Sequence, residues 1–460
     1  MLEKGQKIVV IGAGWGGKGA AVRAVERGCE VILIEEEKLG GVCLHQGCIP
    51  TKALLCSAKR FLEVKEAGNL GIEVDSPRIN WFSIQVRKEN IVENLESQLH
   101  AFLRNRRIKI IFGKATLHTP KKVIVHQKEG EEILETDKII IATGSQPLKI
   151  GRVDWSSPAV LTPKEALKLK ALPQKLIIVG GGVTGVEFAT LFSILGSKVT
   201  LIEILEDILT AEDLRIRRTI AQILRNQGVE ILTGTGFSEI LGHGQDLIEV
   251  KLNDGRKLLA QKALITVGRG PNTQGLGLEN VGVAIDQKGF IVVNEKMETN
   301  VEGIYAVGDV TGKVMLAHWA QKSGEIAAEN ALGENLSINS LCIPHCIYTI
   351  PEVGSCGLTE AEARGLAYET RTGVAYFSAN GFAMSAGKTF GFLQLAIEAG
   401  SGKILGGQMV GEGAAEIIHL LALAVNQKLT VKDFNDRIVI AHPTFSEIVS
   451  EAIKNSERRR

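Results

Sequence analysis

The chain has 460 residues, and its 53 Lys and Arg residues against 52 Asp and Glu residues give a formal net charge of +1. That length predicts two to four domains, each large enough to bury its own core. The balanced charge gives no electrostatic footprint for nucleic acid or an anionic membrane, so small molecules and other proteins are the expected partners. A strand-like run follows the first few residues directly and leaves no room for a leader peptide, which predicts a cytoplasmic protein.

The first predicted element is an apolar strand at residues 7–11, KIVVI, which a glycine-rich turn follows. Gly12, Gly14 and Gly17 have the spacing G-x-G-x-x-G, and a helix-length segment then leads to a second strand, EVILIE, that ends at Glu35. Glycines permit a tight turn and the close approach of backbone N–H groups to a pyrophosphate, whose charge the positive end of the helix stabilises. The carboxylate accepts hydrogen bonds from a ribose. The pattern therefore predicts a dinucleotide site.

The next segment, residues 41–52 (GVCLHQGCIPTK), places Cys43 and Cys48 five positions apart. Five residues of straight helix advance roughly 7.5 Å, whereas a disulfide needs Cα atoms about 4.4 to 6.8 Å apart. A bridge here therefore requires a distorted backbone, for which Gly47 is permissive and in which Pro50 cannot donate an N–H to regular helix. The residues alone leave a redox couple, two idle cysteines and a metal site open. No second Cys or His pair follows at zinc-site spacing, so we expect no metal.

The glycine pattern then occurs a second time. Residues 176–196, LIIVGGGVTGVEFATLFSILG, are apolar, but their five glycines favour a strand, a tight turn and a helix over a membrane span. Gly180, Gly182 and Gly185 repeat the spacing, and the following strand, KVTLIE, ends at Glu203. The first glycine and the acid are 23 positions apart in both copies, and the unit recurs at an offset of 168 residues. Two copies predict two dinucleotide sites and electron transfer between two cofactors.

Glu203 also indicates which nicotinamide cofactor binds. A carboxylate repels a 2′-phosphate, and no basic residue follows before Arg215, so NAD is favoured over NADP. Taken alone, Glu187 is expected on the first turn of the following helix, where a carboxylate interacts favourably with the helix N-terminus. Lys52, taken alone, is expected to be an exposed helix residue.

Two later segments allow both an ordinary and a functional interpretation. EGIYAVGDVTG predicts a strand that stops at Asp309, which is either a turn former or a carboxylate at the ligand-binding edge of an α/β sheet. In AHPTFSE, Thr444 and Glu447 form a capping box, or Glu447 orients His442 as a base. Both accounts hold if the two carboxylate oxygens of Glu447 have separate partners.

Taken together and in order, these motifs resemble those of a known family. The series GAGWGG, GGVCLHQGCIPTK, IIATGS, IVGGGVTGVE, TVGRGPN, EGIYAVGDV, YTIPEVGSCGLTE and AHPTFSE covers nearly the whole chain and is similar to that of the class I FAD-dependent pyridine nucleotide-disulfide oxidoreductases. MLAHWA and GLGLENVGV are most similar to the dihydrolipoamide dehydrogenase branch of that family. The resemblance implies an α/β fold with two Rossmann-like dinucleotide-binding domains, for FAD and NAD, and a C-terminal α+β dimerisation domain. The implied domains are FAD-binding at 1–147, NAD-binding at 148–271, a return to the FAD domain at 272–340 and an interface domain at 341–460.

The resemblance also implies roles for individual residues. Cys43 would be the outer thiol that exchanges with substrate, and Cys48 the thiolate that faces the flavin. His442, from the partner subunit, would be the acid/base, and Glu447 would orient it. The residues implied to hold FAD are Gly12, Gly14, Gly17, Glu35, Lys52, Ala115, Thr143, Gly144, Ser145, Asp309, Leu316 and Ala317. The residues implied to hold NAD are Gly180, Gly182, Gly185, Glu203 and Gly268. Glu187 is the carboxylate implied to pair with Lys52 in the cofactor site.

A few positions depart from the family pattern. Trp15 and Lys18 stand where a proline and an aromatic residue are common, which would alter packing over the cofactor. His45 and Thr51 replace Asn and Ser without removing chemistry. Glutathione reductases would show an arginine pair after the second glycine motif, and mercuric reductases would show vicinal cysteines at the C-terminus. In this chain no arginine follows the second glycine motif before Arg215, and the last cysteine is Cys356.

The implied activity is oxidation of protein-bound dihydrolipoamide to lipoamide, with reduction of NAD+ to NADH through a redox disulfide and FAD. The implied partners are a second copy of the chain and a lipoyl-bearing carrier protein of a 2-oxo acid dehydrogenase or glycine cleavage complex. Two alternatives stay open. One is a related flavin enzyme that acts on another disulfide, a metal ion or a quinone, and the other is a non-catalytic flavoprotein subunit of a complex.

Overall fold

The computed structural model describes residues 5–244, 246–338 and 342–457. Its contacts divide the chain into two compact units. The first consists of Met1–Ala53, Ser83–Lys149 and Gly268–Ser340, and the second of Leu54–Phe82, Ile150–Val267 and Leu341–Arg460. The domain boundary expected between residues 340 and 341 lies outside the described residues.

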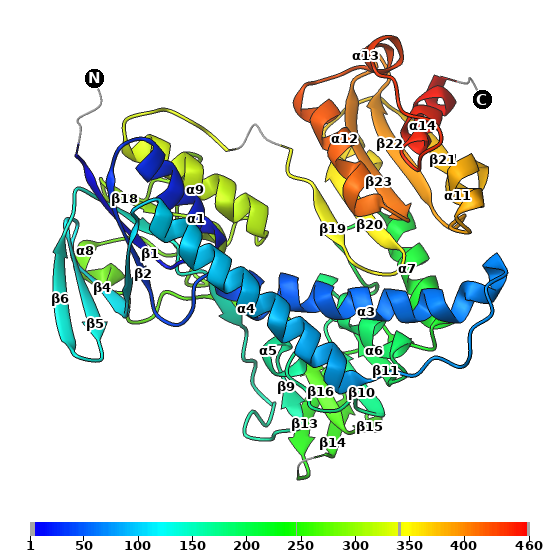
Figure 1. Ribbon diagram of the computed structural model, residues 1–460, viewed down its shortest axis with the longest axis horizontal. Coiled ribbons are helices and arrows are strands. Elements are labelled where there is room, and N and C mark those ends of the chain that lie inside the picture. Colours follow the sequence, from blue (N-terminus) through cyan, green and yellow to red (C-terminus); the bar gives the residue numbers. More distant parts are fainter. Residues whose placement is uncertain (1–4, 245, 339–341, 458–460) are drawn as a thin grey trace. The chain divides into compact units, whose positions relative to one another are not determined.

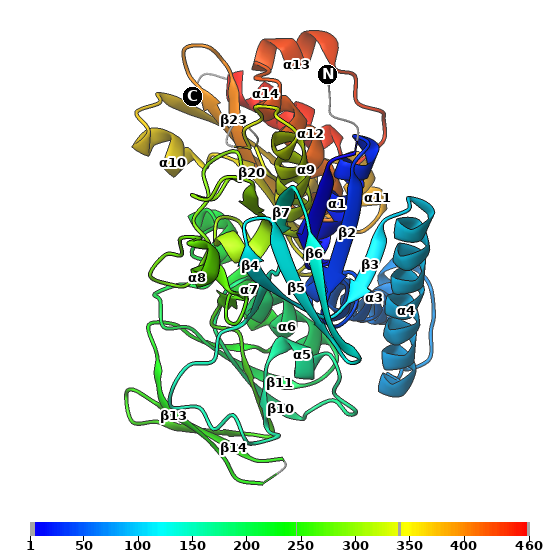
Figure 2. The same ribbon diagram turned by 90° about the vertical axis from the view of Figure 1, so that its left-hand side faces the viewer.

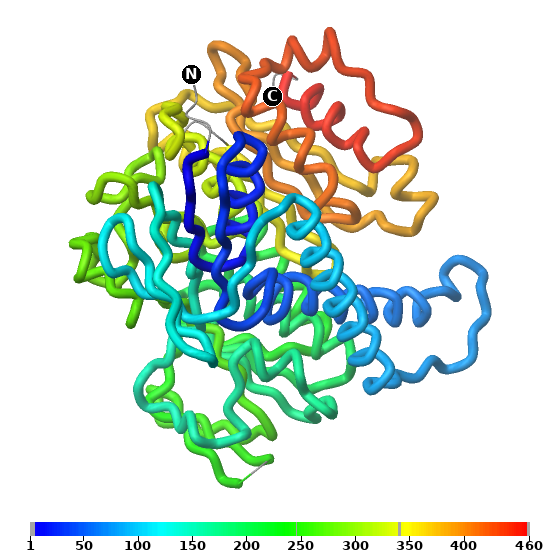
Figure 3. Tube along the Cα trace, turned by 60° about the vertical axis from the view of Figure 1, so that its left-hand side comes forward, coloured from blue at the N-terminus to red at the C-terminus, as the bar shows by residue number. Residues whose placement is uncertain are grey.

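Two long helices, α3 (Cys48–Glu66) and α4 (Trp81–Asn105), each have residues in both units. Figure 3 shows α3 leading into η1 (Ala67–Leu70). After η1 the chain continues through a further segment into α4. The first turns of α3 belong to the first unit and carry Cys48. Cys48 is therefore the first residue of a long helix.

The first unit is built on a parallel sheet of the type that the glycine motif predicts. Its strand order is β18 (Ile304–Ala306), β7 (Lys138–Ile141), β1 (Lys7–Ile11), β2 (Glu30–Glu35) and β3 (Lys109–Phe112). Ile8, Val9 and Val10 are fully buried, as expected for the central strand of a parallel sheet that is covered on both faces. Because β1 and β2 are parallel, the glycine motif after β1 and Glu35 at the end of β2 lie at the same edge of the sheet.

Helices α1 (Trp15–Glu26) and α9 (Ala317–Ala331) pack closely against each other through glycines. A Cβ at Gly19 would lie 2.5 Å from the Gln321 carbonyl oxygen, and a Cβ at Gly324 would lie 2.1 Å from a carbonyl oxygen of α1. Glycine is unfavourable inside a helix, so this close backbone approach is the reason for its presence. The packing fixes the N-terminal end of α1, where the predicted pyrophosphate site lies.

We expect Gly19→Ala to lower the thermal unfolding midpoint, because its Cβ would overlap a backbone atom that has little room to move. Overpacking of this kind typically costs about 1 to 3 kcal/mol. The matched control is Gly68→Ala, since a Cβ at Gly68 would meet no atom within 4 Å. Circular dichroism melts of the two variants test the prediction, and equal midpoints would contradict it.

The second unit repeats this plan. Its parallel sheet has the order β12 (Glu230–Leu232), β11 (Lys198–Ile202), β10 (Lys175–Val179), β16 (Lys262–Ile265) and β9 (Val160–Leu161). The apolar run at 176–196 is the strand β10 followed by α6 (Val183–Ile194), as predicted. No described helix is both long and apolar enough to cross a membrane.

The repeat extends beyond the glycine motifs to a pair of antiparallel three-stranded sheets. In the first unit, β4 (Lys114–Thr119), β5 (Lys122–Gln127) and β6 (Gly130–Glu135) follow the strand β3 and run side by side in Figure 2. In the second unit, β13 (Phe237–Gly242), β14 (Ile248–Leu252) and β15 (Lys257–Ala260) follow β12 in the same way. Both copies thus contain the same succession of strands as well as the same glycine motif.

The C-terminal part of the second unit is an antiparallel domain, coloured yellow to red in Figure 1. Its sheet has the order β19 (His345–Ile347), β20 (Glu352–Gly357), β23 (Ile404–Gly411), β22 (Phe392–Glu398) and β21 (Thr370–Tyr376). The helix α12 (Ala414–Asn426) packs on β20 and β23, and α14 (Glu447–Glu457) packs on β21 and β22. The buried apolar residues of α12 therefore belong to the core of this domain. Two parallel sheets of dinucleotide-binding type and this domain confirm the predicted fold class.

The other described helices and strands are short, except for α7. They are α2 (Gly41–His45), β8 (Ser145–Pro147), α5 (Pro163–Ala166), α7 (Leu214–Asn226), β17 (Arg269–Pro271), α8 (Leu278–Val281), η2 (Gly308–Thr311), α10 (Glu360–Gly365), η3 (Phe377–Ala379), α11 (Gly381–Ser385) and α13 (Val431–Arg437).

Candidate active site

The first glycine motif forms a backbone cradle at the start of α1. Gly12 has φ +101°, and a Cβ there would lie 2.4 Å from the Ala142 carbonyl oxygen. A Cβ at Gly17 would lie 1.8 Å from the Gly12 carbonyl oxygen, so both glycines are required by packing. Gly14 differs, because its nearest neighbour, the Gly41 Cα, is 4.0 Å from the Cβ position. Gly14 is the N-cap residue of α1 and leaves room for a group that approaches the helix N-terminus.

The second motif has the same geometry at the start of α6. Gly180 has φ +107°, and its Cβ would lie 2.6 Å from the Thr266 carbonyl oxygen, while a Cβ at Gly185 would lie 1.9 Å from the Gly180 carbonyl oxygen. Gly182 is the N-cap residue, and a Cβ there would meet nothing within 4 Å. In both copies, two glycines are needed for packing and the middle one leaves open space. This cradle fits the pyrophosphate of a dinucleotide.

The acids at the ends of β2 and β11 are held identically by backbone N–H groups. Glu35 Oε2 accepts from the Ala13 N–H at 2.8 Å, and Glu203 Oε2 accepts from the Gly181 N–H at 2.6 Å. The other oxygen of each carboxylate accepts from the N–H two residues further along the chain, at 2.9 Å. Burial raises the pKa of Glu35, and the backbone hydrogen bonds oppose that rise. The carboxylates are thus fixed against the glycine turns, with lone pairs left for ribose hydroxyls.

Cys43 and Cys48 lie on two separate helices. The helix α2 ends at His45, Gln46 leaves helical geometry with φ −135°, and α3 begins at Cys48. The backbone distortion predicted for a bridgeable pair is therefore present as a helix break. Gly47 has no positive φ, but a Cβ there would lie 3.3 Å from the Val42 carbonyl oxygen, so it permits close approach of the two helices.

The thiols of Cys43 and Cys48 lie close enough to interact with each other. This contact, followed by burial, raises the pKa of Cys43, and a negative charge on Cys48 adds to the rise. The Trp15 side chain and the charge of Lys52 act in the opposite direction.

Two residues near the thiols were not given a role by the sequence. Trp15, at the start of α1, interacts with the Cys43 side chain, and the Lys18 Nζ lies 4.4 Å from the Trp15 ring centroid. Arg269 donates from Nε to the Ser145 Oγ at 2.7 Å and from Nη2 to the Ser145 carbonyl oxygen at 2.6 Å. Burial lowers the pKa of Arg269, while the charges of Asp309 and Cys48 oppose that change.

Asp309 lies in a turn and also takes part in a network of side-chain contacts. Its Oδ2 accepts from the Ser145 Oγ at 2.6 Å and lies 3.9 Å from the Arg269 Nε. Thr143 and Gly144 precede Ser145, and Thr143 exchanges hydrogen bonds with Asn272. The structure thus brings these predicted residues together after β7. Of the remaining ones, Ala115 is buried in β4, and Leu316 and Ala317 are the N-cap and first residue of α9.

The helix-terminus interpretation of Glu187 was wrong. The helix α6 begins at Val183, so Glu187 is its fifth residue and no acid lies on the first turn. Glu187 is 4 % exposed, and its Oε1 accepts from the Tyr348 N–H at 3.0 Å. Gly268, predicted to hold NAD, has φ +128° and open space at its Cβ position, and it begins a segment of the first unit.

His442 and Glu447 form a carboxylate–imidazole pair in the antiparallel domain. The His442 Nδ1 is 2.8 Å from the Glu447 Oε1, and the Thr444 N–H donates to the Glu447 Oε2 at 3.0 Å. The Thr444 hydroxyl donates to the Ala441 carbonyl oxygen instead of completing a capping box. The hydrogen bond with His442 is the main cause that lowers the pKa of Glu447. Each carboxylate oxygen therefore has its own partner, and the imidazole is largely exposed.

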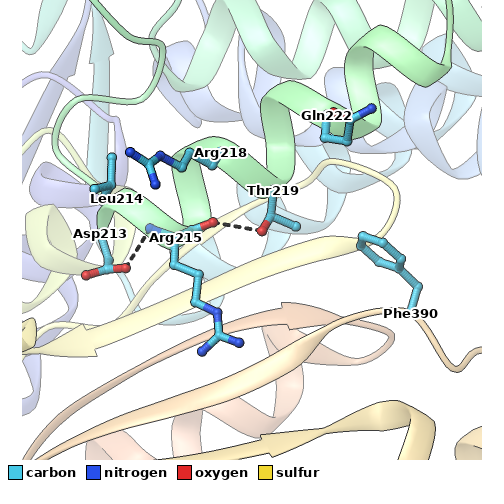
Figure 4. A pocket seen from close by; sticks show the side chains of 7 residues that line it. All are labelled: Asp213, Leu214, Arg215, Arg218, Thr219, Gln222 and Phe390. Atoms are coloured by element: carbon cyan, nitrogen blue, oxygen red, sulfur yellow. Dashed lines mark hydrogen bonds between the residues drawn. The ribbon is translucent and has the colours of Figure 1, made fainter.

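A separate pocket of about 460 Å³ lies beside the start of α7. Figure 4 shows its lining, which comes from α7, the residue before α7 and one aromatic residue that is distant in the sequence. The lining residues are Asp213, Leu214, Arg215, Arg218, Thr219, Gln222 and Phe390. Arg215 already donates to the Tyr376 hydroxyl at 2.6 Å and lies 4.2 Å from the Phe392 ring centroid. We therefore interpret Arg215 as a packing residue, and this pocket contains none of the predicted site residues.

Comparison with known proteins places these features in one family. A model of the pyridine nucleotide-disulphide oxidoreductases matches residues 6–324, and a model of their dimerisation domain matches residues 343–453. Dihydrolipoyl dehydrogenases from Bacillus subtilis and Haloferax volcanii are 38% and 35% identical, over 97% and 99% of this chain and 97% of each relative. Among solved structures, LpdA from Mycobacterium tuberculosis is similar over 98% of this chain and 99% of its own, with 27% identity and a TM-score of 0.92. The HOCl-induced flavoprotein disulfide reductase RclA from Escherichia coli is similar over 97% of this chain and 99% of its own, with 29% identity and a TM-score of 0.88. The family uses FAD and a pyridine nucleotide. With two glycine cradles, a thiol pair and a dimerisation domain, the chain belongs to the pyridine nucleotide-disulphide oxidoreductase family.

Proposed function

We propose that the protein oxidises protein-bound dihydrolipoamide to lipoamide and reduces NAD+ through FAD and a Cys43/Cys48 disulfide. The observation that carries the proposal is the contact between the two thiols at the start of α3. The choice of dihydrolipoamide rests on the relatives that are 35% to 38% identical over nearly the whole chain. The dimerisation domain supports a homodimer, and a lipoyl-bearing carrier protein is the proposed second partner.

In this proposal FAD is held by the cradle of Gly12, Gly14 and Gly17 together with Glu35 and the Asp309 turn. NAD is held by the cradle of Gly180, Gly182 and Gly185 together with Glu203. Bound FAD supplies the transfer of two electrons from the thiol pair to the nicotinamide. The two cradles support these assignments because each has one glycine with open space at the N-terminus of a twelve-residue helix.

The protein residues carry the thiol chemistry. Glu447 holds the His442 Nδ1, which leaves Nε2 of His442, supplied by the partner subunit, to accept a proton from the substrate dithiol. The substrate thiolate attacks the Cys43 sulfur, the bond between Cys43 and Cys48 breaks, and Cys48 leaves as a thiolate. The second substrate thiol then attacks the first substrate sulfur and breaks the mixed disulfide with Cys43. Lipoamide is released with its disulfide, and the proton of that second thiol passes to the Cys43 thiolate. Two electrons have passed to the cysteine pair.

We expect Glu203→Gln to reduce the preference for NAD+ over NADP+ by about tenfold in kcat/KM, which corresponds to about 1.4 kcal/mol. The carboxylate is fixed by two backbone N–H groups and cannot turn away from a 2′-phosphate. The matched control is Glu35→Gln, which removes the equivalent carboxylate from the first glycine motif. Steady-state rates with both nucleotides test this, and an unchanged ratio in Glu203→Gln would exclude the residue as the determinant.

Turnover measurements with several acceptors and donors test the proposed substrate. The FAD-loaded protein should oxidise dihydrolipoamide with NAD+ faster than it reduces glutathione disulfide, Hg2+ or a quinone with NADH. Because the chain is similar to RclA, a flavoprotein disulfide reductase, another disulfide is the second candidate substrate. Preference for one of the other acceptors would replace dihydrolipoamide, and no turnover with any of them would favour a non-catalytic subunit.

A further inference from the structure

A second pair of cysteines lies in the antiparallel domain and has no part in the proposed reaction. The strands β19 and β20 are antiparallel, with Cys346 opposite Gly354. Cys342 lies just before β19, and Cys356 lies on β20. The two side chains lie close enough to interact, because Cys342 packs against the core that contains Cys356.

The two thiols have different environments. Cys356 is 1 % exposed and belongs to the core of the domain, whereas Cys342 is only partly buried and packs against that core. The backbone of Cys342 is fixed to α12, because its N–H donates to the Asn426 Oδ1 at 2.8 Å and its carbonyl oxygen accepts from the Asn426 Nδ2 at 3.1 Å. The accessible thiol is therefore held in place above the buried one.

The surroundings of Cys342 favour its thiolate. The contact with Cys356 is the main cause that lowers the pKa of Cys342 to about 7, and the nearby His345 acts in the same direction. The His345 Nε2 is 2.6 Å from the Glu212 Oε1, and this pair raises the pKa of His345 although burial opposes the change. Cys356 shows the reverse, since its contact with Cys342, burial and the charge of Cys346 raise its pKa. The pKa values of the two thiols are thus displaced in opposite directions.

We propose that Cys342 and Cys356 are a second redox-active pair, which hydroperoxides convert into an intrachain disulfide. The Cys342 thiolate attacks the peroxide oxygen, the O–O bond breaks, and a sulfenic acid forms with release of water or an alcohol. The Cys356 thiol then attacks the Cys342 sulfur and expels hydroxide, which leaves as water with the Cys356 proton. Two thiols lose two electrons in total, and the peroxide gains them. A dithiol reductant reverses the bond by exchange.

The neighbouring residues favour this pair over two other interpretations. No group of three His, Cys, Asp or Glu side chains among the described residues is placed to hold a metal ion. Cys346 shares the sheet face, but its thiol is directed to the Ala415 carbonyl oxygen at 3.9 Å. Cys342 is therefore the expected partner of Cys356, and Cys346 is a matched control.

The experiment uses the full chain with Cys43→Ser and Cys48→Ser, so that it is independent of the proposed catalytic activity. The protein is treated with hydrogen peroxide, remaining thiols are blocked, and disulfide-linked peptides are identified by mass spectrometry. We expect loss of two thiols per chain, one linked peptide pair that contains residues 342 and 356, and full recovery after dithiothreitol. The same treatment of a Cys346→Ser variant should give the same linked pair.

Several outcomes would overturn the proposal. They are oxidation of Cys342 to sulfinic acid with Cys356 still reduced, a linked peptide that contains Cys346, or no loss of thiols in the domain. Cys342→Ser should abolish the linkage while Cys356 stays reduced. Because Cys356 is a core residue, Cys356→Ala is the second variant, and it should leave Cys342 open to stable sulfenic acid trapping. Native circular dichroism spectra of both variants confirm that they are folded.

Discussion

Replacing Cys43 with serine is expected to lower dihydrolipoamide turnover by at least about 10³-fold, because no disulfide can form or exchange without a sulfur at this position. Cys48 remains in place at the start of α3, so FAD binding and NADH oxidation with an artificial electron acceptor should continue. Steady-state assays of both reactions on the same preparation measure the difference. The prediction follows from the contact between the two thiols.

Cys56→Ser is the control for this experiment. Cys56 lies on the same helix as Cys48 but is exposed, so its loss should leave lipoamide turnover within about twofold of the unmodified protein. If Cys43→Ser retained a lipoamide rate similar to that of Cys56→Ser, the pair would be idle. The proposed function would then fail, whereas the proposal for Cys342 and Cys356 would be unaffected.

His442→Gln is expected to lower lipoamide turnover by about 10² to 10⁴-fold, the usual contribution of general acid/base catalysis. Glutamine cannot take up a proton from the substrate dithiol at neutral pH, whereas an imidazole held by Glu447 can. NADH oxidation with an artificial acceptor needs no such proton transfer and should be retained.

His419→Gln is the matched control, since His419 is an exposed histidine on α12 of the same domain. An unimpaired lipoamide rate in His442→Gln would refute the catalytic assignment. Equal losses in the two histidine variants would show that the effect is a general disturbance of the domain.

The glycine motifs show why part of the site could be predicted from the sequence. Each motif is local, and the packing that requires Gly12 and Gly17, or Gly180 and Gly185, involves a turn and the strand beside it. Equal spacing in two copies therefore predicted two similar cradles. The same local logic predicted a helix break between the two cysteines, because no straight helix could bring them together.

The residues that the sequence did not reveal depend on contacts between distant segments. Arg269 reaches Ser145 across 124 positions, and Trp15 meets Cys43 because the starts of α1 and α2 approach within backbone contact at Gly14 and Gly41. The only local signal for Arg269 was an arginine in a glycine-rich segment after a strand. The only local signal for Trp15 was a bulky residue between two motif glycines.

The error at Glu187 has a different physical origin. The first turn was counted from the last glycine of the motif, but the helix N-cap is the middle glycine, Gly182. Gly185 is inside the first turn, where its missing side chain allows contact with the Gly180 carbonyl oxygen. Glu187 consequently lies one turn further along, buried and fixed by the Tyr348 N–H instead of by the helix terminus.

Anaerobic reductive titration of the FAD-loaded protein tests most directly whether Cys43 and Cys48 exchange electrons with the flavin. The oxidised protein should take up four electrons per FAD, with long-wavelength thiolate–flavin absorbance after the first two and bleaching of the flavin only after the second two. Uptake of two electrons per FAD, with bleaching from the start and no long-wavelength band, would contradict the proposed redox pair.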